Sequence, residues 1–204
     1  MSAETFAVVT SKATPLLIDN IDTDVITPIG RVLEGRDAVV KYAFEPMRFT
    51  RDGALDPACP LNDPAFAGAQ ILIGGDNFGC GSSRETAVWA VRGLGYRVVI
   101  AKSFGDIFFS NCFKNGVLAV QLPAEQVDRL AEAAARGETV SVDLQSQRIT
   151  SGDSEAAFAV SSLRKEMLAS GLDDLGLISR RAEAISEFER ADKIARPWVY
   201  QLAE

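Results

Sequence analysis

The chain has 204 residues, of which 47% are hydrophobic, so it can bury one sizeable core, either as one large domain or as a domain with appendages. Its formal net charge is −7 and it has no basic run beyond pairs of arginines, which argues against a nucleic-acid partner. It contains no histidine, which excludes a Ser-His-Asp triad, a Cys-His pair or a His-ligated zinc site built by this chain alone.

The first residues lack the basic and apolar regions of a signal peptide, and no stretch approaches the ~20 apolar residues of a membrane span. We therefore expect a cytoplasmic protein without a membrane partner. The three cysteines are Cys59, Cys80 and Cys112. Their odd number and wide spacing fit neither a disulfide framework nor a C-x-x-C metal site, so we expect reduced thiols without a metal.

Short strand-like runs alternate with amphipathic helical stretches along the chain, which predicts an α/β fold. A first apolar run at residues 15–18 leads into residues 19–24, where crowded Asp and Asn side chains compete with regular backbone pairing and predict a loop. Residues 50–63 are rich in Arg, Asp, Gly and Pro, which predicts an irregular excursion that could cover a site.

A central unit begins with a nearly continuous apolar run at residues 69–73, which is typical of a buried strand. It continues through the glycine-rich segment 74–83 into a helix, predicted from apolar residues at three- and four-residue spacing. Ser83 can cap the start of this helix, and Gly95 can end it in the left-handed conformation.

The unit then continues as strand, helix and strand. We predict a strand at residues 97–101, a helix at 105–114 and a strand at 117–121. Ser103 is a possible cap for the helix, and Gly116 is a possible stop.

The last third of the chain is predicted to add a helix, a hairpin and a helical tail. Pro123 opens a helix that runs to residue 135, and β-branched alternation at residues 139–142 and 147–150 suggests the hairpin. Residues 179–195 form a charge-rich helical stretch with a solvated face. Its large apolar side chains, expected to pack inward or against a partner, are Ile185, Phe188 and Ile194.

The glycine-rich segment carries the chemistry, and several readings compete for it. Glycines between a strand and a helix bring backbone N–H groups close to an anion, which we expect near Ser82 and Ser83. The segment lacks the Gly-Lys-Ser/Thr of a phosphate loop, the G-x-G-x-x-G of a dinucleotide site and the G-x-S-x-G of a hydrolase. The alternative is a tight turn whose glycines serve only packing.

Arg84 favours the anion site. A cation in the first helical turn opposes the helix dipole, so its presence there suggests a counter-ion such as a substrate carboxylate. The alternative is a pair with Glu85 or another local acid.

Several segments then resemble a known family. The string GDNFGCGSSRETAVWA resembles the signature of the swivelling domain in the aconitase superfamily, G-x-N-F/Y-G-x-G-S-S-R-E-H-A. DNIDTDVITP at residues 19–28 resembles an element of isopropylmalate dehydratase small subunits, and SFGDIFFSNCFKNGVLAV at residues 103–120 supports the match. GLDDLG at residues 171–176 and ARPW near the end are also similar, so the resemblance covers nearly the whole chain.

The resemblance implies a fold and a partner. It implies an aconitase-type swivelling β/β/α domain spanning residues 1–204, with residues 160–204 as a C-terminal helical extension. It further implies the small subunit of an iron–sulfur hydro-lyase that is active only with a large subunit. That large subunit would bind a four-iron four-sulfur cluster through three cysteines, and this chain would bind no cofactor or metal.

The implied reaction converts 2-isopropylmalate to 3-isopropylmalate through isopropylmaleate, in leucine biosynthesis. By motif position, Ser82 would remove the carbon-bound proton, as an alkoxide stabilised by backbone amides and positive charge. Arg84 would bind a carboxylate of the small hydroxy diacid, with Ser83 and the backbone at Gly81 assisting. Asp24 matches an acid that supports a catalytic group on the partner side.

The sequence differs from the family pattern at two places that affect the expected substrate. Thr86 stands where the family usually has histidine, and residues 30–49 differ in the segment expected to read the substrate side chain. Arg31 and Arg36 are candidates for a second carboxylate contact, with plain surface charge as the alternative. Two other functions therefore stay open: a related dehydratase acting on citraconate, 2-methylmalate, dimethylmaleate or a homoaconitate-like acid, and a non-catalytic regulatory paralogue.

Overall fold

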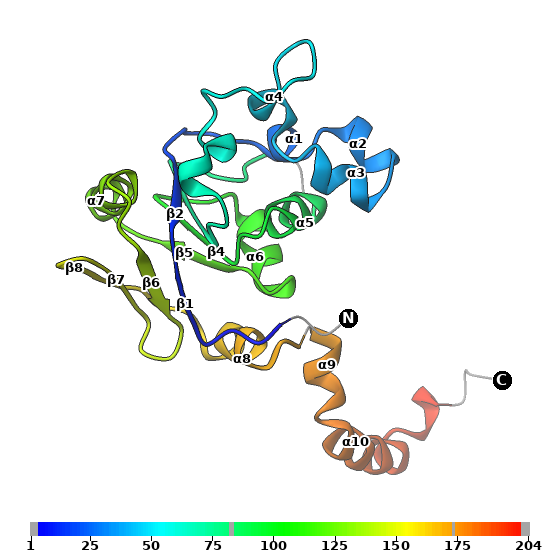
Figure 1. The fold of residues 1–204 in the computed structure, drawn as a ribbon. Coiled ribbons are helices and arrows are strands. Elements are labelled where there is room, and N and C mark those ends of the chain that lie inside the picture. The colour runs from blue at the N-terminus through cyan, green and yellow to red at the C-terminus, as the bar shows by residue number, and fades with distance from the viewer. Residues whose placement is uncertain (1–3, 82–83, 173, 201–204) are drawn as a thin grey trace.

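The structure, a computed structural model, describes residues 4–81, 84–172 and 174–200, and this part of the chain forms two four-stranded sheets (Figure 1). The antiparallel sheet has the strand order β1-β6-β7-β8, and the parallel sheet has the order β2-β3-β4-β5. The combination confirms the predicted α/β class. The strands are β1 (Val8–Ser11), β2 (Ala13–Leu16), β3 (Ile71–Gly74), β4 (Val98–Ala101), β5 (Leu118–Gln121), β6 (Val140–Asp143), β7 (Arg148–Ser151) and β8 (Ser154–Ala157).

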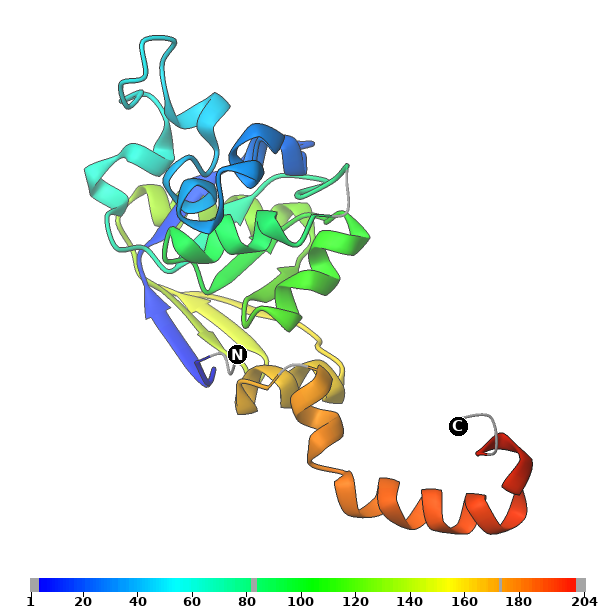
Figure 2. The same ribbon diagram turned by 90° about the vertical axis from the view of Figure 1, so that its right-hand side faces the viewer.

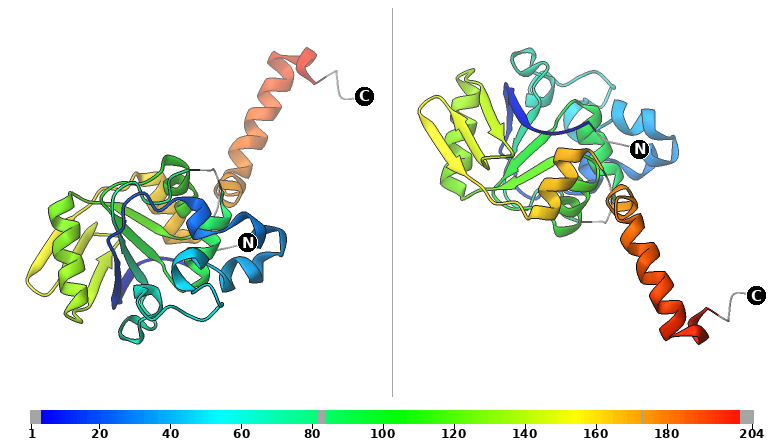
Figure 3. Two further views of the ribbon diagram at one scale, coloured as in Figure 1. Left: turned by 90° about the horizontal axis from the view of Figure 1, so that it is seen from above. Right: turned by 90° about the horizontal axis from the view of Figure 1, so that it is seen from below.

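Helices cover both faces of the parallel sheet: α5 and α6 lie on one side and α7 on the other (Figures 1 and 3). All residues of β3 and β4 are buried as a result, which explains their continuous apolar sequence. The helices are α1 (Thr23–Ile26), α2 (Ile29–Leu33), α3 (Arg36–Lys41), α4 (Glu45–Arg48), α5 (Thr86–Gly93), α6 (Asp106–Lys114), α7 (Ala124–Ala135), α8 (Ser162–Ser170), α9 (Asp174–Ser179) and α10 (Ala182–Ala195).

One residue, Lys12, separates β1 from β2, so the chain passes directly from the antiparallel sheet to the parallel one. In the parallel sheet, Ala13 pairs with Ile71 and Ile71 pairs with Val98. The strands β2, β3 and β4 therefore end at the same edge of the sheet. The loops that leave this edge carry the candidate site.

The predicted central elements agree with the structure to within two residues. The strands expected at residues 69–73, 97–101 and 117–121 are β3, β4 and β5, and the helices expected at 105–114 and 123–135 are α6 and α7. The predicted hairpin is β6 and β7, which pair antiparallel. The strands β1 and β8 were not predicted, because only one residue of each is buried and neither shows the apolar run or clear alternation of the other strands.

The prediction of a loop over residues 19–24 is wrong at its end. Thr23 and Asp24 belong to α1, because the carboxylate of Asp22 accepts a 2.8 Å hydrogen bond from the backbone N–H of Val25 and caps the helix. Asp24 consequently lies in the first turn of a short helix.

Neither serine predicted to cap a helix is seen to do so in the described residues. Ser103 does not cap α6; its hydroxyl donates to the carboxylate of Asp76, and Gly105 precedes the helix without a side-chain cap. Ser83 lies outside the described residues. The helix that it was expected to cap begins at Thr86.

The helical tail predicted at residues 179–195 is α10, which begins at Ala182, and a further helix, α9, precedes it. Before them, α8 packs on α6, and the carbonyl of Leu168 accepts a 2.9 Å hydrogen bond from the backbone N–H of Phe6. The helix α10 extends away from the body (Figure 2). The expectation that its large apolar side chains pack inward is therefore wrong: Ile185, Phe188 and Ile194 are exposed, and packing against a partner stays open.

No helix within the described ranges is long and apolar enough to cross a membrane.

Candidate functional site

The loops that follow β2 and β3 run side by side at the carboxyl edge of the parallel sheet, joined by backbone hydrogen bonds. The N–H of Asn20 donates to the carbonyl of Asp76 (2.8 Å), that of Gly79 to Ile21 (2.7 Å) and that of Thr23 to Cys80 (2.9 Å). Because the main chains make these bonds, the loops hold one another in place independently of their side chains. The arrangement brings α1 next to the segment that leads into α5.

Two glycines let a third loop, the one after β4, pack against this pair. The N–H of Phe78 donates to Ser103 (3.0 Å), and the N–H of Gly105 donates to Phe78 (2.9 Å). A Cβ on Gly105 would lie 2.5 Å from the carbonyl oxygen of Gly79, and Gly79 itself has a φ of +72°. Both glycines therefore serve close packing, and for Gly79 this is what the alternative reading of the glycine-rich segment expected.

Arg84 and Asp24 form an ion pair across the two loops. The Nη1 atom of Arg84 donates to the Oδ1 atom of Asp24, and the Arg84 side chain is 22% exposed against 58% for Asp24. Arg84 precedes α5 rather than lying in its first turn, which corrects the expectation. The nearby Glu85 is engaged elsewhere, since it accepts a 2.9 Å hydrogen bond from Asn115.

This pair leaves Arg84 able to bind a second anion. A guanidinium has five N–H donors, and the pair with Asp24 uses one of them. Asp24 is well placed at the start of α1, where the helix dipole favours a negative charge. The pair therefore presents a partly exposed cation whose orientation is held by an acid from another loop.

The site residues predicted from the motif are only partly visible. Ser82 and Ser83 lie outside the described residues, so their predicted roles stay predictions. Their described neighbour Gly81 is exposed, with a φ of +87°. The structure thus brings together Gly81, Arg84 and Asp24 at one edge of the sheet.

Arg31, the other predicted binding residue, has acidic partners in its own segment. Its Nε and Nη2 atoms donate to Glu45 at 2.8 and 2.5 Å, and Nη1 donates to Glu34 at 2.7 Å. These hydrogen bonds raise the pKa of Arg31, and the bond from Arg31 lowers the pKa of Glu45. The guanidinium of Arg36 lies 5.2 Å from the ring centroid of Trp89, so both arginines contact side chains of the protein.

Thr86 joins α5 to α1. Its carbonyl accepts a 3.3 Å hydrogen bond from the hydroxyl of Thr27, which is fully buried. The Thr86 hydroxyl is itself buried, without a hydrogen-bond partner in the part of the chain that the structure describes. A threonine here therefore fills space rather than offering a titratable group.

Asn115 was not singled out from the sequence, yet it links the start of α5 to the end of α6. Its side-chain oxygen accepts a 3.0 Å hydrogen bond from the indole of Trp89, and its amide nitrogen donates to Glu85. These partners lie 26 and 30 positions away in the chain, so no local pattern could have revealed them.

The cysteines are free. Cys59 and Cys112 are buried, whereas Cys80 lies partly exposed between two site glycines. Burial and, secondly, the negative charge of Asp22 raise the pKa of Cys80, so it is a neutral thiol at physiological pH. Across the described residues, no group of three or more His, Cys, Asp or Glu side chains is arranged to hold a metal ion.

Comparisons with known proteins agree on one family. The aconitase C-terminal domain model matches residues 3–125. The chain is 47% identical over 201 residues to the 3-isopropylmalate dehydratase small subunit of Paramagnetospirillum magneticum, covering 96% of this chain and 100% of that protein. It is 48% identical over 199 residues to the protein of the same name from a Jannaschia species, covering 95% and 98%.

A solved structure confirms the fold. The crystal structure of 3-isopropylmalate dehydratase from Methanocaldococcus jannaschii superposes with a TM-score of 0.66 at 24% identity, covering 88% of this chain and 98% of that one. Together with the domain match, this likeness confirms the predicted aconitase-type swivelling fold.

Proposed function

The chain belongs to the family of 3-isopropylmalate dehydratase small subunits, and from this membership we propose that it is half of a cytoplasmic hydro-lyase of leucine biosynthesis. The proposed reaction converts 2-isopropylmalate to 3-isopropylmalate. Water is eliminated to give isopropylmaleate, and water then adds in the opposite sense, so that the hydroxyl group moves to the neighbouring carbon.

The observation that carries the proposal is the ion pair of Arg84 with Asp24. A hydroxy diacid needs a cation to orient a carboxylate, and Arg84 is partly exposed with N–H donors to spare. We propose that Arg84 binds one substrate carboxylate while Asp24 holds the guanidinium in place. This assigns Asp24 a positioning role within the site.

Ser82 is proposed to remove the proton from the substrate carbon, with Ser83 and the backbone at Gly81 binding the same substrate. A serine hydroxyl is a weak base at neutral pH, so its alkoxide needs nearby positive charge. Arg84, two positions further along the chain, supplies such a charge. The proton returned in the hydration step would come from the Ser82 hydroxyl.

The large subunit completes the proposed enzyme. We propose that the iron–sulfur cluster is bound by the large subunit. An iron–sulfur cluster there would supply Lewis-acid chemistry at the substrate hydroxyl and a carboxylate. This chain would then contribute the proton acceptor and the binding arginine.

Thr86 is proposed to affect packing rather than chemistry, because its hydroxyl is buried at the contact between α5 and α1. Arg31 stays a candidate for the second substrate carboxylate. To bind it, Arg31 would exchange Glu34 or Glu45 for the substrate.

The test is an anaerobic reconstitution with the cluster-loaded large subunit from the same organism. Alkene formation is followed spectroscopically from 3-isopropylmalate, 2-methylmalate, 2,3-dimethylmalate and homocitrate, which are hydroxy acids that can lose water. We expect turnover of 3-isopropylmalate above the others. Turnover of another acid alone would overturn the substrate assignment, and complex formation without turnover of any acid would favour a regulatory paralogue.

A further inference from the structure

The helices after α8 leave the body of the protein with large apolar side chains uncovered. We call residues 174–200, which comprise α9, α10 and a short turn at Pro197–Val199, the C-terminal arm (Figures 2 and 3). Phe188 is 63% and Trp198 is 62% exposed. Several large apolar side chains exposed on one segment are typical of an interaction site, whereas isolated exposed apolar residues are ordinary. The other large apolar side chains exposed on the arm are Leu175, Ile178, Ile185, Ile194 and Val199.

The helix α10 is amphipathic. Ala184, Phe188, Ala191 and Ala195 recur at intervals of three and four residues, which places them on one face. The opposite face is polar and includes Ser186. A helix of this length is marginal in water on its own, so its stability calls for a surface packed against the apolar face.

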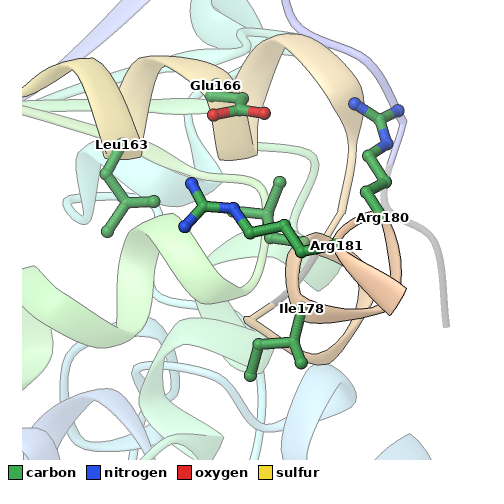
Figure 4. A pocket seen from close by; sticks show the side chains of 6 residues that line it. Leu163, Glu166, Ile178, Arg180 and Arg181 are labelled. Carbon is green, nitrogen blue, oxygen red and sulfur yellow. The ribbon is translucent and has the colours of Figure 1, made fainter. Parts of the chain in front are cut away.

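A cavity at the base of the arm extends this surface. It lies between α8 and α9 and has a volume of about 420 Å³ (Figure 4). That volume is within the range of roughly 300–1,000 Å³ that is typical of binding pockets. The residues that line it are Leu163, Glu166, Leu177, Ile178, Arg180 and Arg181.

The charge at this cavity indicates what it accepts. Figure 4 shows the side chain of Arg181 extending from the start of α10 across towards α8, with Arg180 at the rim. Neither guanidinium has an ion-pair partner within the described ranges. The lining also includes one carboxylate, that of Glu166, so the cavity is positively charged on balance. It fits a segment that offers an apolar side chain next to a carboxylate.

We infer that the C-terminal arm is a docking element for the large subunit, an inference that rests on the proposed function. The apolar face of α10 packs on that subunit, and the cavity receives an apolar side chain flanked by an acid. In Figure 2 residues 75–81, the loop of the candidate site, and the arm both lie on the right-hand side, the loop in the upper part of the body and the arm at its lower end. A partner that covers the site is therefore on the side that the arm can reach.

The size of the surface favours the large subunit over a second copy of this chain. The 14 residues of α10 span about 21 Å. Pairing two such helices along one face covers only several hundred Å², whereas a stable interface buries at least about 1,200 Å². A large subunit can cover α10, α9 and the cavity together.

The experiment measures the affinity of the full chain for the cluster-loaded large subunit. Phe188→Asp places a charge on the apolar face, and the matched control Ser186→Asp places the same charge on the polar face of the same helix. We expect Phe188→Asp to raise the Kd by about 10- to 100-fold and Ser186→Asp to leave it unchanged. Arg181→Glu, at the cavity, should also raise the Kd by reversing the charge at its rim.

A wild-type Kd for Phe188→Asp would overturn the inference, as would an equal loss in Ser186→Asp. Sedimentation of the isolated chain gives the competing outcome: a dimer that Phe188→Asp dissociates, with the Kd unchanged, would assign the surface to a second copy. Turnover by the wild-type pair is measured in parallel. If the wild-type chain binds the large subunit but the complex turns over no diacid, the proposed function is wrong. The Kd values of the variants still test the docking role of the arm in that case.

Discussion

Arg84 donates a hydrogen bond to the carboxylate of Asp24, 60 positions earlier in the chain, and so joins the loop after β3 to the first turn of α1. The two residues come from segments with separate motifs, and the parallel pairing of β2 with β3 brings them together. This ion pair belongs to the described part of the candidate site. We propose that a substrate carboxylate binds there.

The role of Arg84 predicts a large effect of a charge-conserving change. Arg84→Lys keeps the charge but removes the planar fork that binds a carboxylate through two N–H groups. We expect kcat/KM for 3-isopropylmalate to fall about 10- to 100-fold, the equivalent of one charge-assisted hydrogen bond of about 1.5–3 kcal/mol. The control is Arg97→Lys, at the opposite end of the sheet, where β4 begins. Equal kcat/KM values in the two variants would contradict the assignment.

Gly105 is predicted to be intolerant of a side chain. The φ of Gly105 is −65°, so alanine fits the backbone conformation, but its Cβ would meet the carbonyl oxygen of Gly79 at 2.5 Å. We expect Gly105→Ala to lower the free energy of unfolding by about 2–3 kcal/mol in a thermal or urea titration. Gly30→Ala is the control, because nothing lies within 4 Å of its Cβ. Equal stability of the two variants would show that the loops can separate at little cost.

Substitution of Arg31 tests whether this residue binds substrate or only stabilises the fold. If it binds the second carboxylate, Arg31→Gln should raise KM about tenfold or more with little change in Tm. Arg36→Gln, in the next helix, is the comparison. A lower Tm with unchanged KM in Arg31→Gln would instead mean that the residue only ties α2 to α4 through Glu45.

The end of α10 is predicted to loosen in acid. Asp192 accepts hydrogen bonds from Arg196 and Tyr200, and the bond from Arg196 is the main cause of its lowered pKa. A carboxylate with a lowered pKa stabilises the folded form at pH values above its ordinary value of about 3.9, and this contribution is lost as the pH falls below that value. Fluorescence of Trp198, in a Trp89→Phe background, should change over this range. Asp192→Asn should abolish the transition; a transition of the same amplitude in Asp192→Asn would refute its assignment to this carboxylate.

The central α/β unit was predictable because its signals are local. Continuous apolar runs mark β3, β4 and β5, which helices cover on both sides, and Gly95 and Gly116 adopt the positive φ expected of helix stops. The motifs also identified Arg84 and Asp24 as site residues, but separately. The sequence offered Glu85 or another local acid as a partner of Arg84, and the structure shows that Asp24 pairs with it.

The remaining features depend on contacts that the sequence does not show. Ser103 has the residue type of a helix cap, but the Asp76 carboxylate competes for its hydroxyl. The apolar spacing of α10 is the same whether the helix packs on its own body or on a partner, so the sequence left both open. The structure shows that Phe188 is exposed, so the helix does not pack this side chain on its own body.

The most direct test of the account is the turnover of 3-isopropylmalate by Ser82→Ala, assembled with the large subunit. We predict a fall in kcat of at least about 100-fold, the usual contribution of a positioned proton acceptor, with the Kd for the large subunit unchanged. Undiminished turnover in the assembled Ser82→Ala enzyme would contradict the claim that this chain supplies the base.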